Sequence, residues 1–248
     1  MSQENPSQIT GTGSVFTLDG RTVEAARSIE WLKAGWRLFV KKPGTWIGLV
    51  VVGGVILVLL GAIPIVGHLA AHFLLVIFVG GLLLGCKSLS EGGELRIEHL
   101  FAGCKQNTGN LVMVGVYYLV GIVIIFGIVF VIGGGSMLSG AAIGQLAGAG
   151  MIAGGVMLAL LVGLALYMPL AMGIWFAPAL VVFHNVAPLE AMMASFRVCL
   201  KNMGPFLLYG VVLLILCLLA AIPAGLGFLV LLPVLMGAQY ASYRDLFE

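Results

Sequence analysis

The sequence predicts an all-α integral membrane protein with six transmembrane helices, arranged as three hairpins that are each preceded by a cytoplasmic interfacial amphipathic helix. Its composition is the first reason: of 248 residues, 61% are hydrophobic and only 9% are charged. A soluble domain carries about 25% charged residues. Long apolar runs and a one-sided distribution of basic residues are the second and third reasons.

Six apolar segments are long enough to cross a bilayer, which takes roughly 20 residues of helix. They span residues 45–63, 68–87, 109–133, 152–183, 206–222 and 225–242. The fourth is longer than a bilayer requires, and Pro169 and Pro178 inside it favour a kink.

The 12 lysines and arginines all fall before the first span, between the second and third, between the fourth and fifth, or after the sixth. Residues 106–189 contain no Asp, Glu, Lys or Arg. Because basic loops stay in the cytoplasm, the pattern predicts an even number of crossings with both termini cytoplasmic. Residues 1–20 are expected to form a flexible cytoplasmic tail, and residues 21–248 a single membrane domain.

A sequence repeat divides that domain into units of about 21–87, 95–183 and 187–242. Trp36-Arg37 aligns with Phe196-Arg197, and VIFVG (76–80), PLAMG (169–173) and PVLMG (233–237) align without a gap. Glycines at one depth let helix backbones approach closely, although 36 glycines also allow a chance match. The residues expected to pack helices or line a pore are Gly80, Gly173, Gly237, Pro169 and Pro233.

Residues 24–41 are predicted to form an amphipathic helix that lies flat on the inner leaflet. Its apolar stripe is Ile29, Leu32, Trp36, Phe39 and Val40. Lysines on such a helix bind anionic headgroups, so membrane lipids are the expected partners. The residues assigned to the membrane surface are Lys33, Arg37, Lys41, Lys42, Arg197 and Lys201.

Residues 133–150 replace the tight Ile-Pro turn of the other two units. This glycine-rich stretch is interpreted either as a loop that dips back into the membrane, where protein or a water cavity must cover it, or as a flexible or helix-extending hairpin.

Few residues suggest chemistry. No charged side chain lies well inside a span, which argues against a carboxylate relay for protons or sodium. His68 and His72 share one helix face, but the Glu and third ligand of a metal site are missing, so interfacial histidines are the simpler interpretation. No catalytic motif is present, so we expect neither an enzyme nor a cofactor. The net charge of +2 is too small to indicate a nucleic-acid partner.

Three stretches resemble a proteobacterial family of six-helix inner-membrane proteins of unknown function: WFAPALVVFHNVAPLEAMMASFRVCLKNMGPFLLYG (175–210), LPVLMGAQYASYRDLF (232–247) and GWRLFVKKPGTWIG (35–48). The resemblance covers about residues 25–248. The chain is more distantly similar to the membrane domains attached to some glycerophosphodiester phosphodiesterases. The phosphodiesterase chemistry of those proteins belongs to a separate soluble domain, which is not expected in this chain. The resemblance implies a bacterial inner membrane and brings no activity.

Two functions fit these observations. The first is the handling or transport of a small or lipid-like molecule inside the bundle. The second is a non-catalytic module that organises the membrane or recruits partners through its basic cytoplasmic face, with a second copy of the chain or another protein as the partner.

Overall fold

A computed structural model describes residues 16–143 and 145–248, and this part of the chain contains helices and no strand. The helices are α1 (Arg27–Lys41), α2 (Pro43–Gly61), α3 (Val66–Ser90), the 3₁₀ helix η1 (Ile97–Cys104), α4 (Thr108–Ile143), α5 (Gln145–His184), α6 (Pro188–Lys201), α7 (Met203–Ala221) and α8 (Phe228–Phe247).

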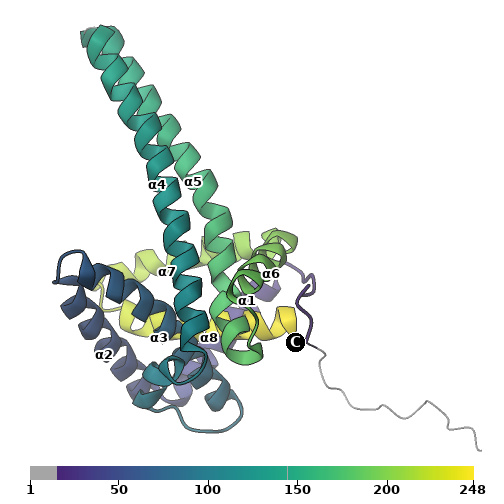
Figure 1. The fold of residues 1–248 in the computed structure, drawn as a ribbon. Helices are drawn as coiled ribbons and strands as arrows, with labels where there is room; N and C mark the ends of the chain where they lie inside the picture. The colour runs from purple at the N-terminus through teal and green to yellow at the C-terminus, as the bar shows by residue number, and fades with distance from the viewer. Residues whose placement is uncertain (1–15, 144) are drawn as a thin grey trace, which may run out of the picture.

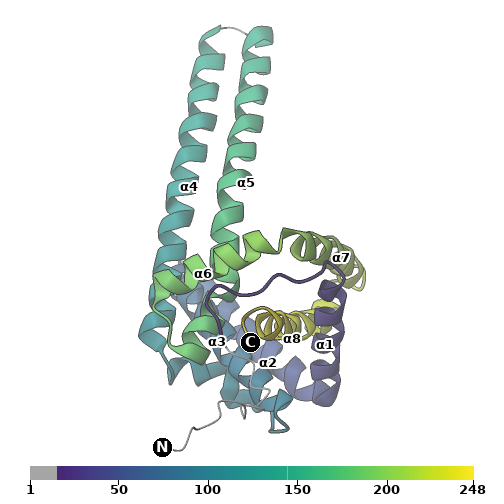
Figure 2. The ribbon, with the colours of Figure 1, turned by 90° about the vertical axis from the view of Figure 1, so that its right-hand side faces the viewer.

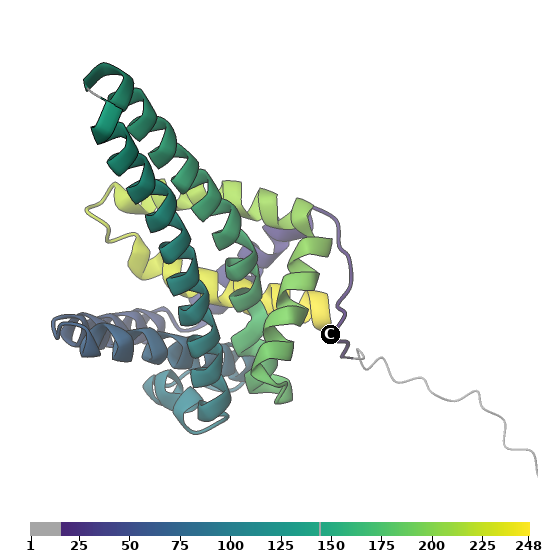
Figure 3. The same ribbon diagram turned by 45° about the horizontal axis from the view of Figure 1, so that its top comes forward.

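Three pairs of consecutive long helices run antiparallel: α2 with α3, α4 with α5, and α7 with α8 (Figure 1). A shorter helix, α1, η1 or α6, precedes each pair. The α4–α5 pair extends as a rod from a compact body formed by the other helices. Figure 3 shows the three connections between paired helices at the ends of the molecule that lie far from the C-terminus.

Among the described residues, five helices are long and apolar enough to cross a membrane, which is the pattern of a multi-pass membrane protein: α2, α3, α4, α5 and α7. The expected sixth span, residues 225–242, is not among them. It lies in α8, whose last turns carry Gln239, Ser242, Arg244 and Asp245 and are mostly buried by other helices. The sixth crossing therefore stays a prediction.

Residues 133–150 extend two helices. α4 continues to Ile143 and α5 begins at Gln145, so the helix-extending interpretation agrees with the structure and the re-entrant loop does not; residue 144 lies outside the described residues. Small residues allow the two helices to touch near the tip. A Cβ on Gly148 would lie 2.1 Å from the carbonyl oxygen of Gly140, and one on Gly155 would lie 2.0 Å from the Cβ of Ser136.

α8 forms the centre of the compact body, with α1 packed across it. The crossing point is made of backbone, because a Cβ on Gly35 would lie 2.1 Å from the carbonyl oxygen of Val234. On the other helix, a Cβ on Gly237 would lie 2.7 Å from the Cα of Gly35. Only glycine permits this approach at both positions.

The burial of α1 differs from the prediction of a helix lying flat on lipid. Leu32 and Phe39 of the expected stripe are buried, together with Trp31 and Leu38, in the protein core. The other three residues of that stripe are exposed: Ile29 (42%), Trp36 (52%) and Val40 (53%). α1 therefore has one apolar face on the protein and a second that is free to meet lipid.

The N-terminal segment also differs from the prediction. Residues 16–20, expected to belong to a flexible tail, pack on the body, while residues 1–15 lie outside the described residues. The backbone N–H of Thr17 donates to the carbonyl of Phe247 (3.0 Å), and Lys201 Nζ donates to the carbonyl of Asp19 (2.9 Å). Figure 2 shows this segment, in dark purple, crossing over the C-terminal end of α8.

The glycine crossing predicts a position-specific loss of stability. Gly35→Leu forces α1 away from α8, because the added atoms meet backbone that cannot give way, and overpacking of this kind costs about 1–3 kcal/mol. Thermal unfolding in detergent, followed by circular dichroism, should show a lower melting temperature. Gly54→Leu in α2 is the control, since a Cβ there meets nothing within 4 Å. Equal melting temperatures for the two variants would contradict the close crossing.

Candidate functional site

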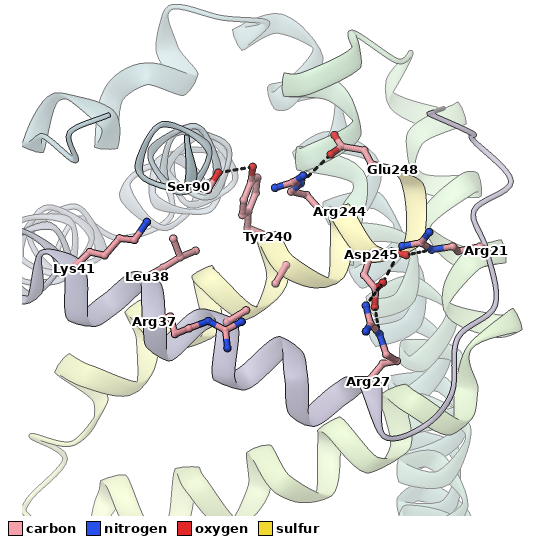
Figure 4. A pocket seen from close by; sticks show the side chains of 12 residues that line it. Arg21, Arg27, Arg37, Leu38, Lys41, Ser90, Tyr240, Arg244, Asp245 and Glu248 are labelled. Atoms are coloured by element: carbon pink, nitrogen blue, oxygen red, sulfur yellow. Dashed lines mark hydrogen bonds and ion pairs between the residues drawn. The ribbon is translucent and has the colours of Figure 1, made fainter. Parts of the chain in front are cut away.

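A basic cavity of about 670 Å³ lies where α1, the end of α8, the end of α3 and the N-terminal segment meet (Figure 4). Its five cationic side chains are Arg21, Arg27, Arg37, Lys41 and Arg244. Two carboxylates, Asp245 and Glu248, also line it. The walls therefore carry an excess of three positive charges, and we refer to this site as the basic cavity.

Asp245 holds the cavity together. Its side chain is only 7% exposed and accepts a hydrogen bond from Arg21 Nη2 (2.9 Å), one from Arg27 Nε (2.9 Å) and one from Trp31 Nε1 (2.8 Å). The Arg21 side chain also donates to the backbone carbonyl of Asp245. One carboxylate thus joins the N-terminal segment, α1 and α8.

The same contacts set the protonation of Asp245. Burial alone would raise the pKa of its carboxyl group, but the hydrogen bonds from Arg27 and Trp31 and the positive charge of Arg27 outweigh burial, so the pKa is lowered. The hydrogen bond and charge of Asp245 in turn raise the pKa of Arg27. Asp245 is therefore ionised at neutral pH and forms an ion pair with the charged Arg27.

The remaining polar side chains that line the basic cavity differ in whether they already have a hydrogen-bond or ion-pair partner within the protein. Arg244 Nε pairs with Glu248 (3.1 Å), and Lys41 Nζ donates to the carbonyl of Leu89 (3.0 Å). The hydroxyls of Ser90 and Tyr240 lie 3.1 Å apart. Within the described part of the chain, the guanidinium of Arg37 makes no hydrogen bond or ion pair, so all its donors are open to a ligand.

An apolar groove of about 660 Å³ lies beside the basic cavity, between α1, α7 and the first half of α8. Leu32 and Trp36 form one wall, and Arg37 and Lys33 stand at the rim. The residues of the other walls are Leu216, Leu219, Ala220, Gly227, Val230, Leu231 and Val234. Arg37 lines both spaces, so cationic and apolar surfaces meet at one side chain.

This arrangement suits an amphiphile. Guanidinium groups bind carboxylates and phosphates through paired hydrogen bonds, whereas the groove offers almost only hydrocarbon.

The six residues assigned to the membrane surface are all exposed, but they lie at different places on the protein. Arg37 and Lys41 line the basic cavity, and Lys33 lines the groove. Lys42 lines neither space. On α6, Lys201 and Arg197 both approach Asp19 of the N-terminal segment, Arg197 at 3.7 Å.

The glycines and prolines predicted to pack helices or line a pore lie at separate interfaces. Gly80 of α3 faces Leu111 and Val182, and Gly173 of α5 lies in ordinary contact with Met192. Gly237 meets Gly35. Of the two prolines, Pro169 lines a shallow apolar hollow beside α4, and Pro233 is buried in α8. These five residues do not converge on one channel among the described residues.

His68 and His72 do not form a metal site with a third ligand. The His72 Nε2 atom is 3.1 Å from the carbonyl oxygen of Gly115, and its ring stacks on Tyr118. Within residues 16–143 and 145–248, no group of three or more potential metal ligands comes together.

Sequence reasoning missed Asp245, Arg21, Arg27 and Arg244. Asp245 gave one usable signal, since a carboxylate in the last turn of a helix is repelled by the negative end of the helix dipole. An acid placed there needs a cation nearby. The sequence could not show that the cations in contact with Asp245 are Arg27 and Arg21, which are 218 and 224 residues away along the chain.

Part of the chain is similar to a known bacterial protein. No protein-family model and no solved structure matches the chain. A protein of Burkholderia thailandensis named "Probable inner membrane protein" is 35% identical over 94 residues, covering 31% of this chain and 35% of the relative. The chain therefore spans about a third of the curated relative it matches. Nothing in these matches supports the expected similarity to glycerophosphodiester phosphodiesterases.

The Asp245 network predicts a specific loss of stability in acid. Because the pKa is lowered on folding, the stabilisation is present above the ordinary pKa of about 3.9 and is lost as pH falls through the folded value. Asp245→Asn should lower the free energy of unfolding at pH 7 by about 1.5–3 kcal/mol. It should also flatten the fall of melting temperature between pH 5 and pH 3.

Asp19→Asn is the matched control, because Asp19 is 78% exposed and its pair with Arg197 is long. An exposed pair contributes about 1 kcal/mol or less. An Asp245→Asn protein with the melting temperature and acid profile of the Asp19→Asn protein would contradict the anchoring role.

Proposed function

We propose that the chain is a multi-pass inner-membrane protein that binds and handles a lipid-like molecule with an anionic headgroup. The observation that carries the proposal is the position of Arg37 on both the basic cavity and the apolar groove. The headgroup lies in the cavity and an acyl chain in the groove. The proposed activity is binding, without a catalytic step.

The inner membrane follows from the name of the Burkholderia thailandensis relative and from the five apolar helices. The basic loops favour the cytoplasmic side for both termini, and a contact between the two ends of the described chain supports an even number of crossings, as the proposed six would be. The backbone N–H of Arg21 donates to the carbonyl of Leu246 (2.8 Å). Segments in such contact lie on the same side of a membrane, which requires an even number of crossings.

The proposed topology predicts the side on which each terminus is found. A reporter that is active only in the cytoplasm should be active when fused after Glu248. Arg96→Cys, made after the exposed Cys104 is replaced by Ser, should resist an impermeant thiol reagent in intact cells and react in inverted vesicles. A reporter active only in the periplasm, or labelling of Arg96→Cys in intact cells, would overturn the six-crossing arrangement.

The shared position of Arg37 predicts how lipid binding is lost. Arg37→Gln should weaken binding of a phosphatidylglycerol probe to the detergent-purified protein about tenfold, because a charge-assisted contact worth about 1.5–3 kcal/mol is removed. Leu219→Trp, at an exposed groove residue, should also weaken it by filling the chain site. Lys42→Gln is the control, with the same loss of charge outside both spaces. Native mass spectrometry of bound lipid measures the result.

A different outcome would favour the module that recruits partners or organises lipid. Lys42, at the junction of α1 and α2, and Arg197 and Lys201 of α6 are exposed basic residues outside the basic cavity. If neutralising these three residues abolished salt-sensitive vesicle binding while Arg37→Gln did not, the basic surface would be the functional element and the cavity would not.

A further inference from the structure

We infer that the headgroup bound in the basic cavity carries two or more negative charges on phosphate, as a phosphomonoester or a diphosphate does. The inference rests on the proposed function and names its ligand more closely. Its basis is the charge that remains in the cavity after every internal pair is counted.

The internal pairs leave three positive charges without a counter-charge. Asp245 neutralises one of the two arginines that it binds, Arg21 and Arg27. Glu248 neutralises Arg244. Arg37 and Lys41 have no carboxylate partner within the described residues. A zwitterionic headgroup or a phosphodiester with one charge would leave at least two of the cavity's cations without a counter-charge.

The donors also surround the cavity from several directions, which suits the tetrahedral oxygens of a phosphate better than a flat carboxylate. Arg37 and Lys41 extend from successive turns of α1, and the arginines bound to Asp245 close one end (Figure 4). The hydroxyls of Ser90 and Tyr240 lie on the wall from α3 and α8. Arginine binds phosphate in a bidentate manner and lysine as a point charge.

The size of the cavity agrees with a large headgroup. About 670 Å³ is within the range of small-molecule sites, roughly 300–1,000 Å³. The adjoining groove favours a lipid as the source of the phosphate. A lipid can occupy both the basic cavity and the groove, whereas a free phosphate would occupy only the basic cavity.

The test compares two anionic lipids that share their acyl chains. Full-length protein in phosphatidylcholine nanodiscs is titrated with fluorescent phosphatidic acid, a monoester, and with fluorescent phosphatidylglycerol, a diester. We expect phosphatidic acid to bind about tenfold more tightly, and inorganic pyrophosphate to compete with it. The double variant Arg37→Gln/Lys41→Gln should remove the preference. Lys42→Gln/Lys105→Gln removes the same charge at exposed lysines outside both the basic cavity and the groove and should keep it. Equal melting temperatures establish that both variants are folded.

Each result separates the two proposals. Equal affinity for the two lipids would overturn the polyanionic headgroup and leave the proposed function in place. Binding of neither lipid would overturn the proposed function and the inference together. Tight binding of pyrophosphate without binding of phosphatidic acid would show a site for free phosphates and overturn the lipid ligand.

Discussion

The hydrogen-bonded carboxylate of Asp245 is the interaction on which the arrangement of the N-terminal segment, α1 and the end of α8 depends. It is buried at the last turn of α8 and accepts hydrogen bonds from Arg21, Arg27 and Trp31. A buried charge is costly unless it is paired and hydrogen-bonded, so the N-terminal segment and α1 must stay where they satisfy it. Because one carboxylate binds two guanidinium groups, the same contact that stabilises the fold leaves positive charge in the cavity. In the proposed function, one residue thus contributes to both stability and ligand binding.

The packing of α1 on α8 has a similar double effect. Gly35 and Gly237 let the two backbones touch, and this brings Arg37 to the boundary between the basic cavity and the apolar groove. A wider crossing would separate the two spaces and remove the surface that fits an amphiphile. The glycine at position 237 was recognised as a packing residue from its repeat with Gly80 and Gly173. Its partner, Gly35, was not, because it belongs to no repeated pentapeptide.

The long helices were predictable because each apolar run is bounded by charge, proline or glycine. The face that α1 buries was not, since its apolar residues cover more than half the circumference: the sequence places Trp36 and Phe39 on one stripe, yet Trp36 is exposed and Phe39 is buried. Hydropathy identifies residues that avoid water and cannot distinguish contact with lipid from contact with protein. The basic cavity was beyond prediction for another reason, because Arg21 and Asp245 meet only after the whole chain has folded.

The same distinction resolves the difference between five apolar helices and an even number of crossings. A hydropathy criterion measures how well a helix tolerates lipid, and a helix enclosed by other helices does not have to meet it. α8 is enclosed by α1, α2, α3 and α7. Its polar side chains find partners inside the protein: Gln239 donates to the carbonyl of Trp175, and Ser242 donates to the carbonyl of Gln239. In the proposed topology α8 therefore crosses the membrane as an interior helix. Because other helices surround it, α8 can cross the membrane with fewer apolar residues than a helix that faces lipid.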